Sequence, residues 1–212
     1  MLSQTDKKPG IIYIGGMITR GKWGEIPLSV GECHKVNVTS AQRLASLYRQ
    51  DFSPMTLQDY GDYVCFENWW QSGKKYKGLE HDISKEWWKR QTKGKRRCQL
   101  AKKSGFKVEY ASWSEFGNSK IGYIESRKKV YVPFYEEMVK CRDSIKKLQN
   151  LVKSGQNIVV YDFDGPHNEL GPVVEPLTLE LLKEKIECPK RPFGHGYIVA
   201  ALIAGIPSSN YI

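Results

Sequence analysis

The chain has 212 residues, of which 40% are hydrophobic and 26% are charged, and its formal net charge is +10. This composition supplies enough apolar side chains for a buried core, so it excludes a disordered, collagen-like or tail-like protein. The length favours one large domain over two small ones. The excess of positive charge favours a polyanionic partner or an anionic substrate, although it serves solubility equally well.

The cysteines and histidines predict neither disulfides nor a bound metal. The five cysteines are odd in number, widely spaced and never arranged as C-x-x-C, which favours a reducing compartment. Three histidines lack partners at metal-ligand spacing, so we expect no metal site and no other cofactor; they are His34, His81 and His167.

Nothing in the sequence predicts an association with membranes. The polar N-terminus lacks the apolar centre of a secretory signal. The longest apolar run, 197–206, is about half as long as a bilayer span requires. We therefore expect a soluble, cytoplasmic protein.

The first half of the chain predicts short elements. An apolar run at 11–14 lies between Gly- and Pro-containing pairs and predicts a buried strand, while 18–35 predicts loop and edge strand. Apolar spacing over 39–48 indicates a short helix. Residues 63–77 indicate a strand that leads into a helix.

The second half has clearer periodicity. Apolar residues recur every three or four positions over 133–155, with a proline at the start and a glycine at the end, which predicts one long helix. A β-branched run at 157–163 predicts a buried strand that ends in a turn. A short amphipathic helix at 178–186 and a final apolar element at 197–206 follow. These elements predict a single α+β domain in which helices pack around a small mixed sheet.

Positive charge is concentrated between residues 85 and 107. This segment holds ten basic side chains and one acidic one, a net charge of +9. Trp87, Trp88 and Phe106 lie among them, and cations interleaved with aromatics are typical of a nucleic-acid surface. The alternative is a solvated helix face whose tryptophans pack into the core. The side chains that we expect to contact nucleic acid are Lys89, Arg90, Lys93, Lys95, Arg96, Arg97, Lys102 and Lys103.

Three further motifs carry groups that can perform chemistry. In the first, Glu67, Gln71 and Lys74 are spaced to share one stripe of a helix, with Trp70 beside them. A carboxylate, an amide and an ammonium beside a ring would form the polar wall of a pocket. The alternative is an ordinary exposed stripe with a favourable Glu-to-Lys arrangement.

The second motif is a pair of carboxylates at the end of the predicted strand 157–163. Asp162 and Asp164 are two residues apart, so on a strand they share one face, opposite Tyr161 and Phe163. Chemistry in α/β-type architectures is placed at the carboxyl ends of such strands. Partial burial of the pair would raise the pKa of one carboxyl group. The alternative is that Asp164 only begins an Asp-Gly-Pro turn.

The third motif is Phe193-Gly194-His195-Gly196, directly before the apolar run 197–206. Two glycines around His195 would let the backbone approach a ligand closely. If the apolar run is a helix, its free N–H groups would suit a phosphate or pyrophosphate. The alternative is a histidine that satisfies backbone groups in a tight turn.

In order along the chain, these motifs resemble the NADAR family of ADP-ribose-handling N-glycosidases. Phe52-Ser53-Pro54 looks like the family's early Ser/Phe/Pro loop, and Glu67-x-x-x-Gln71-x-x-Lys74 is similar to its Glu-x-x-x-Gln-x-x-Lys helix. Residues 133–155 resemble its long helix. Asp162-Phe163-Asp164-Gly165 and Gly194-His195-Gly196 stand where the family has an acidic residue before a glycine-containing segment and a Gly-rich helix start.

The resemblance implies helices around a small sheet and cleavage of an N-glycosidic bond to ribose. It covers residues 50–205 as the NADAR-like core, with 1–49 as an N-terminal extension. Members of the family act on early riboflavin-pathway intermediates or on ADP-ribosylated guanine in nucleic acid. The basic segment favours the nucleic acid, because a polynucleotide gains from each phosphate that is neutralised. Such an enzyme would counter an ADP-ribosylating toxin, as an antitoxin or an anti-defence protein.

The resemblance also assigns roles to residues. Cleavage passes through an oxocarbenium-like state, for which Glu67 and Asp164 would supply carboxylates, with Asp162 in support. Lys74 would contact phosphate and Gln71 would orient the ribose or base. The remaining residues expected to bind the ligand are Trp70, stacking on a ring, His195, binding or donating, and Phe193, Gly194 and Gly196.

Two alternative functions remain open at this point. One is a basic protein that binds nucleic acid or ADP-ribose without turnover. The other is an N-glycosidase that acts on a small nucleotide metabolite, for which the basic segment would be incidental.

Overall fold

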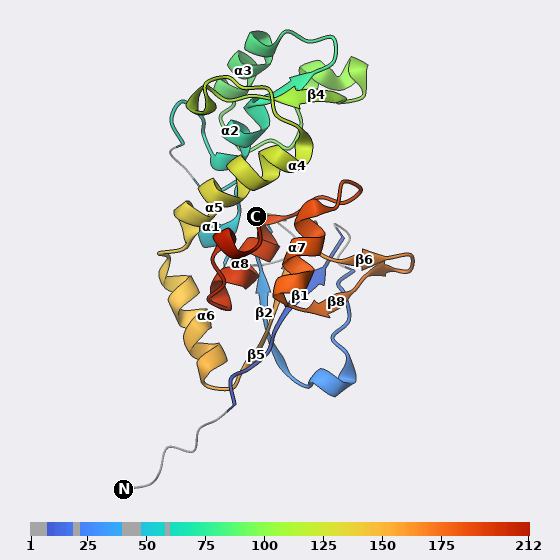
Figure 1. The fold of residues 1–212 in the computed structure, drawn as a ribbon, viewed down its shortest axis with the longest axis vertical. Coiled ribbons are helices and arrows are strands. Elements are labelled where there is room, and N and C mark those ends of the chain that lie inside the picture. The colour runs from blue at the N-terminus through green and yellow to red at the C-terminus, as the bar shows by residue number, and fades with distance from the viewer. Residues whose placement is uncertain (1–7, 19–21, 40–47, 58–59) are drawn as a thin grey trace, which may run out of the picture.

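The fold is built on a four-stranded mixed sheet. The computed structural model describes residues 8–18, 22–39, 48–57 and 60–212, and it is an α+β fold of helices around this small sheet, as the sequence predicts (Figure 1). The strands lie in the order β2-β5-β1-β8. Their bounds are β1 Ile12–Gly16, β2 Cys33–Asn37, β5 Asn157–Asp162 and β8 Val174–Pro176. β5 is parallel to both β1 and β2, whereas β8 is antiparallel to β1.

The strand period of two divides the sheet into two buried faces. Ile14 and Val160 point to the face covered by helices, where α8 (His195–Ile203) packs on β1 and β5. Tyr13 and Tyr161 point to the opposite face, which a smaller apolar cluster covers. β1 and β2 come from the predicted extension 1–49, and both are integral to this sheet.

The middle of the chain forms a separate group of elements at one end of the molecule (Figure 1). It comprises α2 (Phe66–Ser72), β3 (Lys74–Tyr76), α3 (His81–Lys89), η2 (Gln99–Ser104) and β4 (Val108–Ala111). β3 pairs with β4 in an antiparallel ladder. The small core of these elements is formed by Tyr76, Trp88, Cys98 and Ala101.

The remaining elements connect these parts. The helical segments are α1 Arg49–Phe52, α4 Tyr123–Ser126, η4 Arg127–Tyr131, α5 Val132–Val139, α6 Asp143–Lys153 and α7 Leu179–Glu187, with short turns η1 Leu28–Val30, η3 Ser114–Phe116 and η5 Ser208–Asn210. A small hairpin joins β6 His167–Asn168 to β7 Gly171–Pro172. Among the described residues, no helix has the length and apolarity to cross a membrane.

Two element predictions are wrong. Residues 63–77 form a helix that leads into a strand, the reverse of the predicted order. Gly73 permits this exit because an added Cβ would lie 2.0 Å from Cε2 of Trp113. The predicted helix 133–155 is two helices, because Arg142 adopts an extended ψ of 140° between α5 and α6. Each half still keeps its apolar spacing, so the pattern alone does not reveal the break.

The structure also decides the two elements predicted near the C-terminus. The final apolar element is a helix, α8, and Thr178 caps α7 by accepting a hydrogen bond from the Leu181 N–H at 3.1 Å. Most of the helix predicted at 39–48 lies outside the described residues.

Candidate functional site

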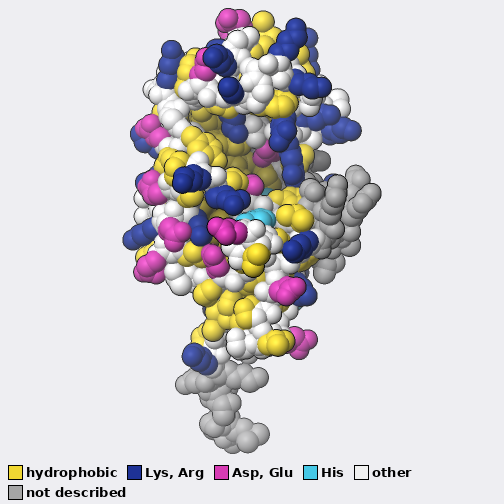
Figure 2. Space-filling view, turned by 90° about the vertical axis from the view of Figure 1, so that its right-hand side faces the viewer, with side chains coloured by type: hydrophobic (Ala, Val, Ile, Leu, Met, Phe, Trp, Pro, Cys, Tyr) yellow, Lys and Arg dark blue, Asp and Glu magenta, His cyan; other side chains and the backbone are white. Residues whose placement is uncertain are grey.

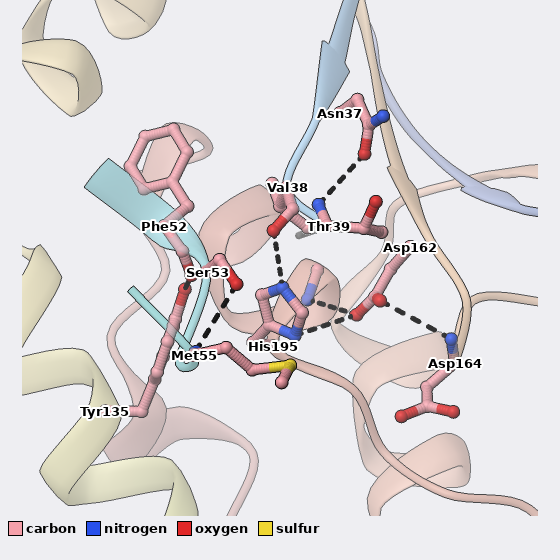
Figure 3. A network of polar contacts seen from close by, with 11 residues as sticks. Asn37, Val38, Thr39, Phe52, Ser53, Met55, Tyr135, Asp162, Asp164 and His195 are labelled. Carbon is pink, nitrogen blue, oxygen red and sulfur yellow. Dashed lines mark hydrogen bonds and ion pairs between the residues drawn. The ribbon is translucent and has the colours of Figure 1, made fainter. Parts of the chain in front are cut away.

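The carboxyl ends of the three parallel strands meet at one edge of the sheet, where polar side chains gather (Figure 3). β5 ends at Asp162, and β2 is followed by Val38 and Thr39. This is the edge at which open α/β sheets bind ligands. The predicted position of the carboxylate pair at this edge is confirmed for Asp162. Asp164 lies beyond the strand's end, in the turn that the alternative reading describes.

Asp162 is a buried carboxylate, 1% exposed, and it is held on three sides. Its Oδ2 accepts a hydrogen bond from the Gly196 N–H at 2.8 Å and lies 3.3 Å from Nδ1 of His195. Its Oδ1 accepts from the Asp164 N–H at 3.5 Å. His195 is fixed in turn because its Nε2 donates to the carbonyl of Val38 at 2.8 Å. The network therefore joins β2, β5 and α8.

The glycines at the start of α8 serve this carboxylate. A Cβ added to Gly194 would lie 2.3 Å from Asp162 Oδ2, and one added to Gly196 would lie 2.6 Å from Asp162 Cβ. Both glycines therefore make room for the protein's own side chain, and their predicted close approach to a ligand stays a prediction. The anion at the N-terminus of α8 is Asp162, which the helix dipole favours.

Two adjoining cavities open beside Asp162. One has a volume of about 230 Å³ and the other of about 210 Å³. Both are lined by Glu67, Gln71, Tyr131 and Asp164. The wall of the first cavity also includes Asp162 and His195, whereas the wall of the second also includes Trp70, Lys74 and Phe193. Figure 2 shows a hollow in this face of the molecule, with Lys and Arg side chains gathered around it and acidic side chains inside.

The structure therefore brings together predicted residues from three separate segments. Lys74 reaches the cavity from strand β3. The prediction that Glu67, Gln71 and Lys74 share one stripe of a helix is therefore wrong for Lys74. The ammonium of Lys74 lies over the ring of Trp70, 5.2 Å from its centroid. Trp70 stacks on Trp113 at a centroid distance of 5.0 Å and is 7% exposed, so it forms the cavity wall. Nε2 of Gln71 donates to Glu67 Oε1 at 2.8 Å.

The electrostatics of the site centre on Asp164. The side chain of Asp164 is exposed to solvent at the cavities, while protein atoms crowd around its carboxyl group, so the predicted partial burial holds for Asp162 and not for Asp164. The loss of solvation caused by these atoms and the neighbouring Asp162 raise the pKa of Asp164 to about 6; Glu67 adds to the rise, and His195 and Arg96 oppose it. Burial lowers the pKa of the Lys74 ammonium, which Glu67 and Asp164 counteract. The cavity thus holds one carboxyl group that exchanges its proton near neutrality.

Two wall residues have no counterpart in the sequence-based site. Arg127 and Tyr131 belong to a π-helical turn, η4, a feature that is frequent at functional sites. Arg127 is 2% exposed and donates to the carbonyls of Ile186 at 2.9 Å and Arg191 at 3.0 Å. It therefore fixes the loop that leads to Phe193. A π-helical turn leaves no clear trace in the spacing of apolar residues, so sequence reasoning could not find this pair.

Thr39 is a third residue that sequence reasoning missed. Its side chain is 1% exposed and lines the first cavity, and among the described residues its Oγ1 has no hydrogen-bond partner. A buried hydroxyl without a partner costs free energy, so such a group marks a place where a ligand or water binds. A threonine directly after a strand at this edge is the only signal that the sequence offers.

The basic segment adjoins the cavities, but not all of it is available. Lys89 pairs with Asp62 at 3.1 Å and with Glu86 at 3.6 Å at the surface, and Trp88 is fully buried and so does not fit the predicted nucleic-acid surface. For Trp88 the alternative reading, packing into the core, is correct. Arg96 lines the first cavity. The structure leaves all of the predicted contact residues exposed or half-buried: Lys89, Arg90, Lys93, Lys95, Arg96, Arg97, Lys102 and Lys103.

Neither a metal centre nor a known relative explains the site. In the part of the chain that the structure describes, no three His, Cys, Asp or Glu side chains converge to hold a metal ion. No protein-family model, curated protein or solved structure matches the chain. The interpretation of the site therefore depends on the residues of this chain.

The raised pKa of Asp164 predicts how stability depends on pH. Between about pH 4 and pH 6 the unfolded carboxyl has lost its proton while the folded one retains it, so the free energy of unfolding falls as pH rises. Asp164→Asn removes this penalty. We expect the variant to be more stable than the wild type at pH 8 by about 1 kcal/mol, after allowance for solvent screening, and equal to it at pH 3.

Urea denaturation at both pH values measures this difference. Glu169→Gln, at an exposed position, is the matched control and should leave stability unchanged at either pH. A gain for Asp164→Asn that is the same at pH 3 and pH 8 would contradict a pKa of about 6 for Asp164.

The unpartnered hydroxyl of Thr39 gives a second stability prediction. Thr39→Val replaces a buried hydroxyl without a partner by a methyl group and should stabilise the ligand-free protein by about 1 kcal/mol. Thr56→Val is the matched control, because Thr56 Oγ1 donates to the Arg49 carbonyl at 2.7 Å, and it should destabilise by about 1 kcal/mol. Thermal denaturation compares the two. Destabilisation by both substitutions would show that the Thr39 hydroxyl already has a partner in solution.

Proposed function

We propose that this protein is an N-glycosidase that releases ADP-ribose from a nucleobase, guanine by the family resemblance, in DNA or RNA. One observation carries the proposal. Glu67 from α2 and Asp164 from the turn after β5 line the same cavity, and the pKa of Asp164 is about 6. Two carboxyl groups in different environments facing one space are what glycoside cleavage requires.

In the proposed mechanism the bond between the ribose C1′ and the base nitrogen breaks, and its electron pair leaves with the base. Glu67, whose Oε1 is held by the Gln71 amide, stabilises the positive charge that develops on the sugar. Protonated Asp164 gives its proton to the departing base, and water then adds to C1′ and returns a proton to Asp164, whose pKa of about 6 suits both transfers near neutrality. Asp162 supports the reaction by holding the backbone of Asp164 and the ring of His195.

The remaining cavity residues bind the ADP-ribose. Lys74 supplies positive charge, with its ammonium placed to contact a phosphate oxygen. Gln71 and the Thr39 hydroxyl are hydrogen-bonding groups for the ribose or base. His195 contributes to the floor of the cavity, and Trp70 and Phe193 form its apolar side.

Nucleic acid is the favoured carrier of the modified base because the cations lie beside the cavity. Arg96 lines the cavity itself, and Arg97, Lys102 and Lys103 belong to the same segment. A small metabolite would gain little from these charges, whereas a polynucleotide gains from each phosphate contact. In a cell such an enzyme would reverse the action of an ADP-ribosylating toxin. Survival of toxin-producing cells with and without this protein would measure that role.

Glu67→Gln and Asp164→Asn test the mechanism. Each variant keeps the shape of the side chain but removes a carboxylate, so we expect ADP-ribose release from an ADP-ribosylated oligonucleotide to fall by about 100-fold or more. Affinity for plain DNA should stay unchanged, because neither residue belongs to the basic segment. Chromatography of the released ADP-ribose measures turnover, and fluorescence anisotropy measures binding.

The outcomes of that experiment separate the alternatives. Unchanged turnover in both variants would remove the mechanism. Salt-sensitive binding of nucleic acid without release by the wild type would favour the non-catalytic binding protein. Release from an ADP-ribosylated nucleoside, without binding of plain DNA, would favour the enzyme acting on a small metabolite.

The nucleic-acid surface has a separate prediction. Replacing Lys102 and Lys103 by alanine should weaken oligonucleotide binding and lower the slope of log K against log salt by roughly 0.7–0.9 for each phosphate that the variant no longer neutralises. Replacing Lys146 and Lys147, two exposed lysines on α6, removes the same charge and should leave the slope unchanged. Equal effects of the two pairs would mean that only the net charge matters.

A further inference from the structure

Asn68 lies on α2 between the cavity residue Glu67 and the core residue Trp69, and it is fully buried. Its side chain makes two hydrogen bonds to one distant stretch of backbone. Nδ2 donates to the carbonyl of Lys93 at 3.3 Å, and Oδ1 accepts from the Lys95 N–H at 2.9 Å. A buried amide that satisfies both a donor and an acceptor of a loop holds that loop in one position.

The loop is pressed against the wall of the cavity at the residue between these two bonds. A Cβ added to Gly94 would lie 2.9 Å from Met55 Cβ and 3.0 Å from the Met55 carbonyl oxygen. Met55 itself lines the first cavity, next to Ser53 and Pro54. The loop therefore approaches the site as closely as the backbone allows, and only glycine fits there.

The next residue after the loop is Arg96, which faces the cavity. Its guanidinium lies over the ring of Phe163, with Cζ 5.0 Å from the ring centroid, and the residue lines the same cavity as Asp164. Phe163 directly precedes Asp164, so a cation on this ring is near the carboxyl group. The stacking is a cation–π contact whose strength at an exposed site is about 0.5–1 kcal/mol.

We propose that Asn68 is a positioning residue: through the backbone of 93–95 it holds Arg96 at the mouth of the cavity, facing Asp164. α2 then performs two tasks with neighbouring residues, since Glu67 points into the cavity and Asn68 fixes the basic loop. Arg96 favours the ionised form of Asp164 and receives a phosphate of the nucleic acid. The catalytic part of this assignment rests on the proposed function, whereas the link from Asn68 to Arg96 and Asp164 does not.

Several charged and titratable groups face Asp164 from the elements around it. The carboxyl groups are Asp162 on β5 and Glu67 on α2, and the other groups are His195 and Tyr197 on α8, Lys74 on β3, Tyr131 on η4 and Arg96 on the loop. Arg96 lowers the pKa of Asp164, and among these groups it is the one that directly follows the loop bound by Asn68. Releasing the loop should therefore raise that pKa, whichever carboxyl group acts as acid or base.

The test compares Arg96→Met, Asn68→Leu and the double variant. Carboxyl ¹³C NMR titration of the Asp164 side chain should show its pKa raised by roughly half a unit in each single variant, as for one charge screened by solvent. The double variant should show no further rise, because both changes remove the same interaction. The limb of the pH–rate profile for ADP-ribose release that Asp164 governs should move to higher pH by the same amount.

Two further variants serve as controls. Asn68→Ala removes both hydrogen bonds to the loop without adding a charge or the bulk of leucine, so it should give the same shift as Asn68→Leu. Asn150→Leu, at an exposed position of α6, should leave the pKa unchanged. A shift in Arg96→Met without one in either Asn68 variant would overturn the role of Asn68.

The outcome for Arg96 is decided in the same experiment. No shift in Arg96→Met would overturn the contact between Arg96 and Asp164. If the wild type releases no ADP-ribose at any pH, the proposed function fails. The NMR titration of Asp164 still decides the positioning role in that case, because it needs no substrate.

Discussion

The site depends on one buried carboxylate, Asp162, at the end of the central strand. A charge removed from water must be paired, and the free N–H groups of a helix N-terminus together with an imidazole provide that pairing. The Gly196 N–H and the His195 ring therefore bind Asp162, and the two glycines of α8 let the helix come close enough to do so. The same contacts therefore fix both the position of α8 on the sheet and the position of the Asp162 carboxylate.

This constraint determines what Asp164 can do. With Asp162 committed to the helix, Asp164 is left in the turn beyond the strand, where the cavities open. Loss of solvation and the nearby carboxylates keep its pKa near 6, which opposes folding at neutral pH but places a proton-exchanging group in a cavity.

The sequence predicts the strong local signals and misses what depends on long-range packing. The β-branched run before Asp162 identifies the strand, whereas the glycine pair around His195 and the apolar run after it leave the type of the final element open. The turn at Asp164 and the exit of the chain at Gly73 depend on close packing against residues far away in the sequence, so spacing misjudges them. Lys74 nevertheless reaches the cavity, because β3 returns the chain beside α2.

Asn68 and Thr39 illustrate a second limit of sequence reasoning. An asparagine inside a helix and a threonine after a strand are ordinary residues in any sequence, and their meaning comes only from their partners. Asn68 has two backbone partners in the basic segment, whereas the Thr39 hydroxyl has none among the described residues. The first observation joins the basic segment to the cavity, and the second leaves a hydrogen-bonding group unused inside it. A cavity with a fixed cation at its mouth and an unused hydroxyl in its wall is suited to a ligand that carries both phosphate and hydroxyl groups, and a ribose phosphate carries both.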